Sequence, residues 1–220
     1  MTRGSGKSLK ALNMKWLVGL VFFDVLVVIV LLAPVILTNA TITQFGVTRG
    51  LFAFAMPVLV LLLVNALPHD VKSMLVYWKA RGVLPGCEAF TKYALADQRI
   101  DMSSLRKHVG SLPTDPGEQN SKWYQLYKMV ANEPEVAEAH KLFLMYRDMA
   151  VLSLPLIVIM PVATYLICTT ARQVWIAASL FTVQYFLAAM SARWSGIRFV
   201  CNVLAVHSTK KVGGRKGPAV

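Results

Sequence analysis

The sequence predicts an all-α membrane protein, and its composition and charge carry that prediction. Of the 220 residues, 56% are hydrophobic and only 15% are charged, whereas soluble domains average about 45–50% apolar and about 25% charged. A formal net charge of +12 accompanies this apolar excess, and basic residues collect on the cytoplasmic flanks of membrane helices. Three cysteines are too few for the framework of a disulfide-rich secreted domain.

Four apolar segments are expected to cross the membrane as helices: residues 16–38, 51–67, 149–168 and 174–190. A span needs about 20 residues to cover about 30 Å of hydrocarbon. The first and third segments are long enough alone, and the other two can borrow apolar neighbours. The first segment is also longer than the apolar core of a signal peptide, which has about 7–15 residues. This length favours a retained anchor over a cleaved leader.

The distribution of Lys and Arg predicts the orientation of these segments. Residues 1–15 carry four basic residues and no acid, residues 191–220 carry six and no acid, and each short loop carries one basic residue. By the positive-inside rule, both termini and residues 68–148 are cytoplasmic. We therefore expect two transmembrane hairpins, 16–67 and 149–190, flanking a cytoplasmic insert, with a basic arm and a basic tail at the ends.

The insert is nearly neutral, with eleven basic and ten acidic residues between positions 68 and 148. A nucleic-acid-binding surface would be strongly basic, so direct nucleic-acid binding is not expected there. The basic tails suit anionic lipid, where each Lys or Arg is worth about 1 kcal/mol. A nucleic-acid contact by residues 210–217 is the less favoured alternative.

Local signals predict that the insert is mostly helical. Residues 69–81 carry an apolar stripe at helical spacing, which fits a helix at the membrane interface or one packed on the rest of the insert. Asp101 and Asp115 are expected N-caps, and Pro116 and Glu118 strengthen the second of these helix starts.

Two longer helices are expected to follow in the insert. The helix after Asp115 should end near Ala131. A further helix, capped by residues 132–135, meets no breaker from Val136 to Pro155 and is expected to run into the third span.

Asp24 is the one charged residue inside a predicted span. A buried acid at membrane depth costs roughly 2.5–3.5 kcal/mol on insertion scales and faces a bundle interior or a water path. The spans hold no basic partner for it, so we expect it to be protonated or hydrogen-bonded, with Asn65, Thr164 and Gln184 as candidate partners. It is either a gating, pore-lining or proton-responsive residue, or a hydrogen bond that fixes helix packing.

Four further residues are candidates for coupling the insert to the membrane. Arg147 and Asp148 stand at the start of the third span, where Arg147 could also be a snorkelling flank. Trp123 and Tyr124 lie in the insert, where aromatic residues are more often core. No metal-ligand spacing, catalytic triad or phosphate-binding glycine loop occurs in the sequence, so no catalytic, cofactor or metal site is expected and an enzyme is not favoured.

The layout and three stretches of the insert, residues 84–90, 97–101 and 112–127, resemble small multi-pass membrane effectors of bacterial antiviral defence, such as the membrane protein associated with some retrons. The resemblance implies a toxin of the bacterial inner membrane that kills the infected cell. It also implies that a cytoplasmic protein or ribonucleoprotein holds the toxin in check.

Three hypotheses follow for the function. The first is an oligomeric inner-membrane effector that permeabilises the membrane under control of the insert. The second is a small channel or proton-coupled transporter that uses Asp24. The third is a non-catalytic anchor whose insert docks a soluble partner.

Overall fold

The computed structural model describes residues 9–38, 55, 59, 61–62, 66–167 and 171–209. These residues are largely helical and contain no β-strand, which confirms the all-helical part of the predicted fold class. The helical elements in chain order are α1 (Leu9–Thr38), α3 (His69–Tyr77), η1 (Pro85–Glu88), η2 (Ala89–Tyr93), α4 (Ala94–Ala96), α5 (Met102–Val109), α6 (Pro116–Val130), α7 (Pro134–Ile167) and α8 (Ala171–Thr209).

Three helices in the described part of the chain are long and apolar enough to cross a membrane. Their candidate spans are Asn13–Leu31 in α1, Pro134–Leu166 in α7 and Ala171–Thr209 in α8. They cover most of the first and third apolar segments recognised in the sequence and all of the fourth. Most of the second segment, residues 51–67, lies outside the described residues, so four spans and two hairpins stay a prediction.

The expected helix starts in the insert are confirmed. The Asp101 carboxylate caps α5 by accepting from the backbone amide of Ser103 at 2.9 Å. The Asp115 carboxylate caps α6 by accepting from the amides of Gly117 and Glu118 at 2.9 and 3.0 Å. Both caps satisfy amide groups that the first turn of a helix leaves without a partner.

Helix α7 is continuous over 34 residues even though it contains Pro155 and Pro161. This confirms that one helix runs from the insert into the third apolar segment. Each proline removes one backbone donor.

Helix α8 is longer than the sequence indicated, because it has 39 residues and ends at Thr209. The sequence favoured a basic tail from residue 191, and the structure shows helix over much of that segment. Four of the six basic residues that defined the tail come after Thr209. The helical part instead carries buried apolar side chains, among them Phe199, Val203 and Leu204.

Helix α3 ends at Tyr77, four residues before the end of the expected 69–81 helix. Trp78 adopts a left-handed conformation with φ of 53°, which is unfavourable for residues with a side chain. The Arg193 guanidinium lies over the Trp78 ring, 3.7 Å from its centroid. Arg193 Nε also donates to the carbonyl oxygen of Val76 at 2.8 Å, so α8 holds the end of α3 in place.

The chain divides into two compact units. Unit 1 takes in Met1–Lys72 and Leu144–Ala192, and unit 2 takes in Ser73–Phe143 and Arg193–Val220. Unit 1 thus contains α1 and parts of α7 and α8, whereas unit 2 contains most of the insert and the last part of α8.

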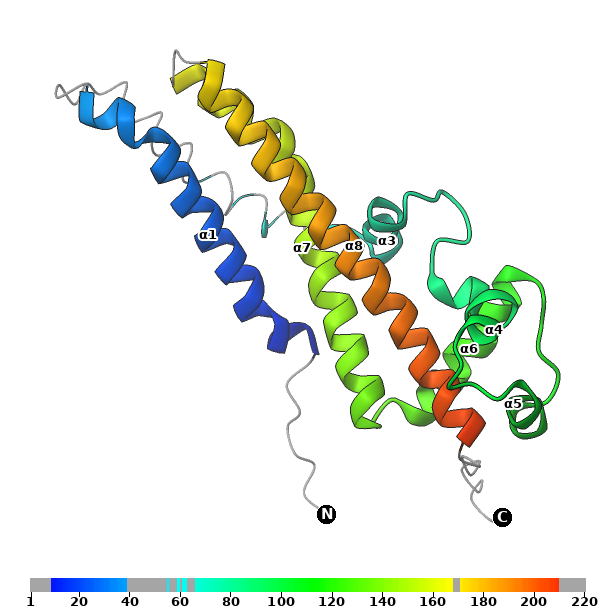
Figure 1. Ribbon diagram of the computed structural model, residues 1–220. Helices are drawn as coiled ribbons and strands as arrows, with labels where there is room; N and C mark the ends of the chain where they lie inside the picture. The colour runs from blue at the N-terminus through cyan, green and yellow to red at the C-terminus, as the bar shows by residue number, and fades with distance from the viewer. Residues whose placement is uncertain are drawn as a thin grey trace, which may run out of the picture. The chain divides into compact units, whose positions relative to one another are not determined.

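In unit 1, α1 lies beside α8 (Figure 1). Gln173 of α8 donates from Nε2 to the carbonyl oxygen of Leu31 at 3.3 Å. Apolar side chains from all three helices fill the interior, and Leu17, Leu152 and Phe181 are almost completely buried. The unit therefore has a real helix–helix core.

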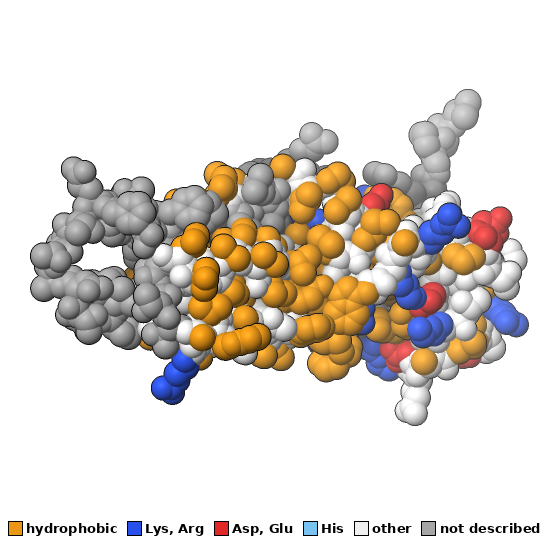
Figure 2. Space-filling view, turned by 90° about the horizontal axis from the view of Figure 1, so that it is seen from above, with side chains coloured by type: hydrophobic (Ala, Val, Ile, Leu, Met, Phe, Trp, Pro, Cys, Tyr) orange, Lys and Arg blue, Asp and Glu red, His pale blue; other side chains and the backbone are white. Residues whose placement is uncertain are grey.

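The outer faces of these helices are also apolar. Phe22 is 69% exposed, Val30 62% and Leu187 65%, and Figure 2 shows hydrophobic side chains over a large part of the surface that it presents. Large exposed apolar patches are uncommon on soluble monomers and mark contacts with membranes or other proteins. The exterior of unit 1 therefore suits a membrane.

Unit 2 is built around a cluster of four rings. The Phe199 ring of α8 packs edge-on against Trp123, with centroids 5.1 Å apart, and stacks on His140 at 4.6 Å. The Tyr127 hydroxyl and His140 Nδ1 are 3.0 Å apart, at hydrogen-bond distance. This cluster ties α6, α7 and the last part of α8 together.

Gly196 allows a close approach in unit 2, and its replacement with alanine is expected to destabilise the protein by about 1–3 kcal/mol. A Cβ atom there would collide with the Tyr77 hydroxyl and lie 3.1 Å from the Phe143 ring. Thermal unfolding of the purified protein measures the loss. Gly19→Ala is the control, since Gly19 has open space around it, and an equal effect of the two substitutions would contradict this reading.

Candidate functional site

Asp24 of α1 lies at the centre of a polar cluster in unit 1. Its side chain is fully buried, and Oδ1 accepts a hydrogen bond from Nε2 of Gln184 on α8 at 2.9 Å. The same Gln184 nitrogen lies 3.1 Å from Oγ of Ser153 on α7. One carboxyl, one amide and one hydroxyl therefore join α1, α7 and α8.

This cluster leaves two acceptor oxygens without a hydrogen bond in the described part of the chain. They are Oδ2 of Asp24 and Oε1 of Gln184, and both are buried. A buried acceptor without a partner costs about 1–3 kcal/mol. A proton on Oδ2 would turn this oxygen into a donor, and a water molecule could donate to either oxygen.

Two members of the cluster line a groove of about 390 Å³ within unit 1. Gln184 and Ser153 contribute polar atoms, and the rest of the wall is mainly apolar, with Leu20 and Phe23 of α1 and Leu187 of α8. Asp24 is not among the residues that line the groove, and its side chain is fully buried. It contacts the groove wall through its hydrogen bond with Gln184. Gln184 thus connects the buried carboxyl to the groove.

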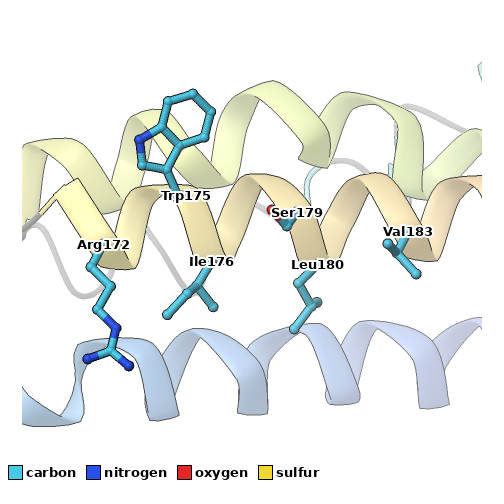
Figure 3. A pocket seen from close by; sticks show the side chains of 6 residues that line it. All are labelled: Arg172, Trp175, Ile176, Ser179, Leu180 and Val183. Atoms are coloured by element: carbon cyan, nitrogen blue, oxygen red, sulfur yellow. The ribbon is translucent and has the colours of Figure 1, made fainter.

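A larger groove of about 670 Å³ lies along α8 nearer its start. Figure 3 shows Arg172, Ile176 and Leu180 pointing towards α1, whereas Trp175 points away from it. Apart from Arg172 and Ser179, the residues that line this groove are apolar. It offers apolar surface to a lipid chain or another helix, and none of its described lining residues is acidic.

The three candidate partners of Asp24 have different positions. Gln184 makes the hydrogen bond just described. Thr164 donates to the carbonyl oxygen of Met160 in its own helix at 2.8 Å, so this hydroxyl is used within α7. Asn65 lies outside the described residues. Ser153 was missed, because a single serine in an apolar segment gives no sequence signal.

Arg147 and Asp148 form part of a second buried cluster in unit 1. Arg147 donates to Asp148 Oδ1 from Nη2 at 2.8 Å and from Nε at 3.1 Å. Lys72 Nζ reaches the same oxygen at 3.3 Å, and all three side chains are at most 7% exposed. Arg147 is therefore held in an ion pair at the protein interior rather than extended to the surface.

Trp123 and Tyr124, the other coupling candidates, belong to unit 2. Trp123 is 8% exposed and sits in the ring cluster. Tyr124 is 48% exposed, and the Lys128 ammonium lies 5.0 Å from its ring centroid. The structure thus places Trp123 in the packing of unit 2 and leaves Tyr124 exposed, and a coupling role for the two residues stays a prediction.

No family model, curated protein or solved structure matches this chain.

Proposed function

We propose that this chain is an integral membrane protein that lets protons or small cations cross the bilayer, and that Asp24 is the residue they meet. The observation that carries the proposal is the buried Asp24–Gln184–Ser153 cluster beside a groove. Intramembrane acids are costly and commonly mark ion pathways or proton relays. The exposed apolar faces of the three helices support a location within lipid.

In this proposal the protein acts as a membrane effector that collapses ion gradients. Four helices form two hairpins in a bacterial inner membrane, both termini are cytoplasmic, and several copies assemble through their spans to form the pathway. The insert serves as the control element and the contact site for a cytoplasmic regulator. The uninterrupted α7 supports this role, because one continuous helix carries residues of both the insert and the third apolar segment.

The test is induced expression in bacteria with a voltage-sensitive dye. We expect the wild-type chain to depolarise cells and Asp24→Leu to abolish the effect. Asp24→Asn is the decisive variant, since the amide keeps the size and hydrogen bonding of the carboxyl but cannot take up a proton. It should also lose the leak.

Thr164→Val is the matched control, because it removes a buried hydroxyl of α7 that bonds within its own helix. It should leave the leak unchanged when membrane levels of the variants are equal. If Asp24→Asn depolarises cells as well as the wild type does, Asp24 only fixes helix packing and the proposal is wrong. A wild-type chain that leaves the membrane potential unchanged would refute it too.

A further inference from the structure

The second buried cluster of unit 1 surrounds a cavity of about 230 Å³, far larger than the ~30 Å³ of a water molecule in the liquid. Its wall combines Lys72, Arg147 and Asp148 with two further polar groups, the Asn13 amide and the His69 imidazole. This cavity is separate from the Asp24 cluster, with which it shares no residue.

The lining of the cavity carries an excess of positive charge. Lys72 and Arg147 share the single carboxylate of Asp148. All eleven acidic residues of the chain lie in its described part, and Asp148 is the acid that lines this cavity. Asp70 Oδ1 lies 3.7 Å from His69 Nδ1, but the Asp70 side chain is 86% exposed and so lies largely in solvent. Two buried cations with one buried carboxylate therefore favour an anion in the space between them.

The remaining polar groups suit an anion as well. Burial is the main cause that lowers the pKa of His69, and the positive charge of Arg147 is the next, so the ring is uncharged at neutral pH. Asn13 brings a neutral amide to the same wall. Arginine and lysine are the side chains that proteins most often use for phosphate oxygens, through charge-assisted hydrogen bonds.

The cavity also lies where three apolar segments begin or end. Asn13 is the first residue of the candidate span of α1, and Lys72 follows the apolar segment 51–67 by five residues. Asp148 immediately precedes the apolar stretch 149–168 of α7. In a bilayer, the ends of apolar helices lie at the depth of the lipid headgroups.

We propose that this cavity binds a phosphate group, and that an anionic phospholipid supplies it. The inference uses the location in a membrane but does not require ion conduction, so lipid binding and depolarisation can fail independently.

The test uses the purified full-length protein in a mild detergent. One arm adds dioleoyl phosphatidylglycerol or, for comparison, zwitterionic dioleoyl phosphatidylcholine. A second arm adds inorganic phosphate against chloride at equal ionic strength. Binding is measured by the shift in unfolding temperature and by the number of bound lipids in native mass spectrometry. We expect binding of phosphatidylglycerol over phosphatidylcholine.

Lys72→Met is the key variant, because it removes the excess charge and leaves the Arg147–Asp148 pair balanced. It should weaken phosphatidylglycerol binding about tenfold or more, since a hydrogen bond to a charged group is lost. Lys72→Arg should restore it. Lys107→Met makes the same charge change at an exposed site of α5 and should bind as the wild type does.

The two arms identify the source of the phosphate group. A response to the lipid alone supports the lipid headgroup, and an equal response to inorganic phosphate supports a free phosphate ligand in the same cavity. If Lys72→Met and Lys107→Met bind alike, or if neither probe is bound by the wild type, the proposal is wrong.

Discussion

Replacement of Asp148 with leucine is expected to destabilise the protein by about 3–5 kcal/mol, the usual result of breaking a buried ion pair from one side. Asp148 Oδ1 is the acceptor for both Arg147 and Lys72, and all three side chains are almost completely buried. Leucine carries no charge, so the substitution removes the carboxylate that Lys72 and Arg147 share in the interior. Unfolding of the purified protein in detergent, followed by tryptophan fluorescence, gives the free energy.

A matched control lies on the same helix. Glu138 of α7 is exposed, so Glu138→Leu makes the same change in charge and should alter stability by less than about 0.5 kcal/mol. The double variant Lys72→Met with Asp148→Leu should be more stable than Asp148→Leu alone, because it buries one cation fewer. Equal losses from Asp148→Leu and Glu138→Leu would show that water enters the cluster and replaces the carboxylate.

Replacement of Gln119 with leucine should lower the free energy of unfolding by about 3 kcal/mol or more, because Gln119 is a buried residue of unit 2. The Gln119 side chain is almost fully buried, and its Oε1 accepts from the backbone amides of Phe90 and Thr91 at 3.0 and 3.3 Å. Its Nε2 donates to the carbonyl oxygen of Thr114 at 2.8 Å. Leucine would leave three backbone groups without these partners, at about 1–3 kcal/mol for each that stays buried.

Gln125→Leu provides the comparison, since Gln125 is exposed on the same helix α6. It should change the free energy of unfolding only slightly. Gln119→Glu adds a second measurement. When its carboxyl is protonated, near pH 4 and below, the side chain keeps one acceptor oxygen and has an O–H donor in place of the amide N–H, so its stability should fall between those of the wild type and Gln119→Leu. A Gln119→Leu protein as stable as the Gln125→Leu protein would contradict the assignment.

Local chemistry explains which parts of the fold could be predicted from the sequence. The caps at Asp101 and Asp115 involve residues two or three positions away, so the pattern of residue types is enough to locate the starts of α5 and α6. The continuity of α7 follows from the lack of a breaker after Val136. Apolar segments of sufficient length likewise predicted the three helices that can span a membrane.

Contacts between distant residues explain what could not be predicted. The end of α3 depends on the position of Trp78 beneath Arg193, 115 residues later in the sequence. The role of Gln119 depends on a segment 28 and 29 residues before it. Asp24 was recognised as a candidate because a charge in an apolar segment is visible by itself, whereas Ser153 and Lys72 gain meaning only from their neighbours in space.

The Lys72–Asp148 pair also constrains the order in which the chain can fold. The two residues are 76 positions apart, and the chain between them makes up most of the insert. A growing polypeptide cannot form this ion pair until Asp148 has been synthesised, and burying an ammonium without its carboxylate is costly. Unit 1 combines Met1–Lys72 with Leu144–Ala192, so its contacts cannot be completed before the second of these segments has been synthesised.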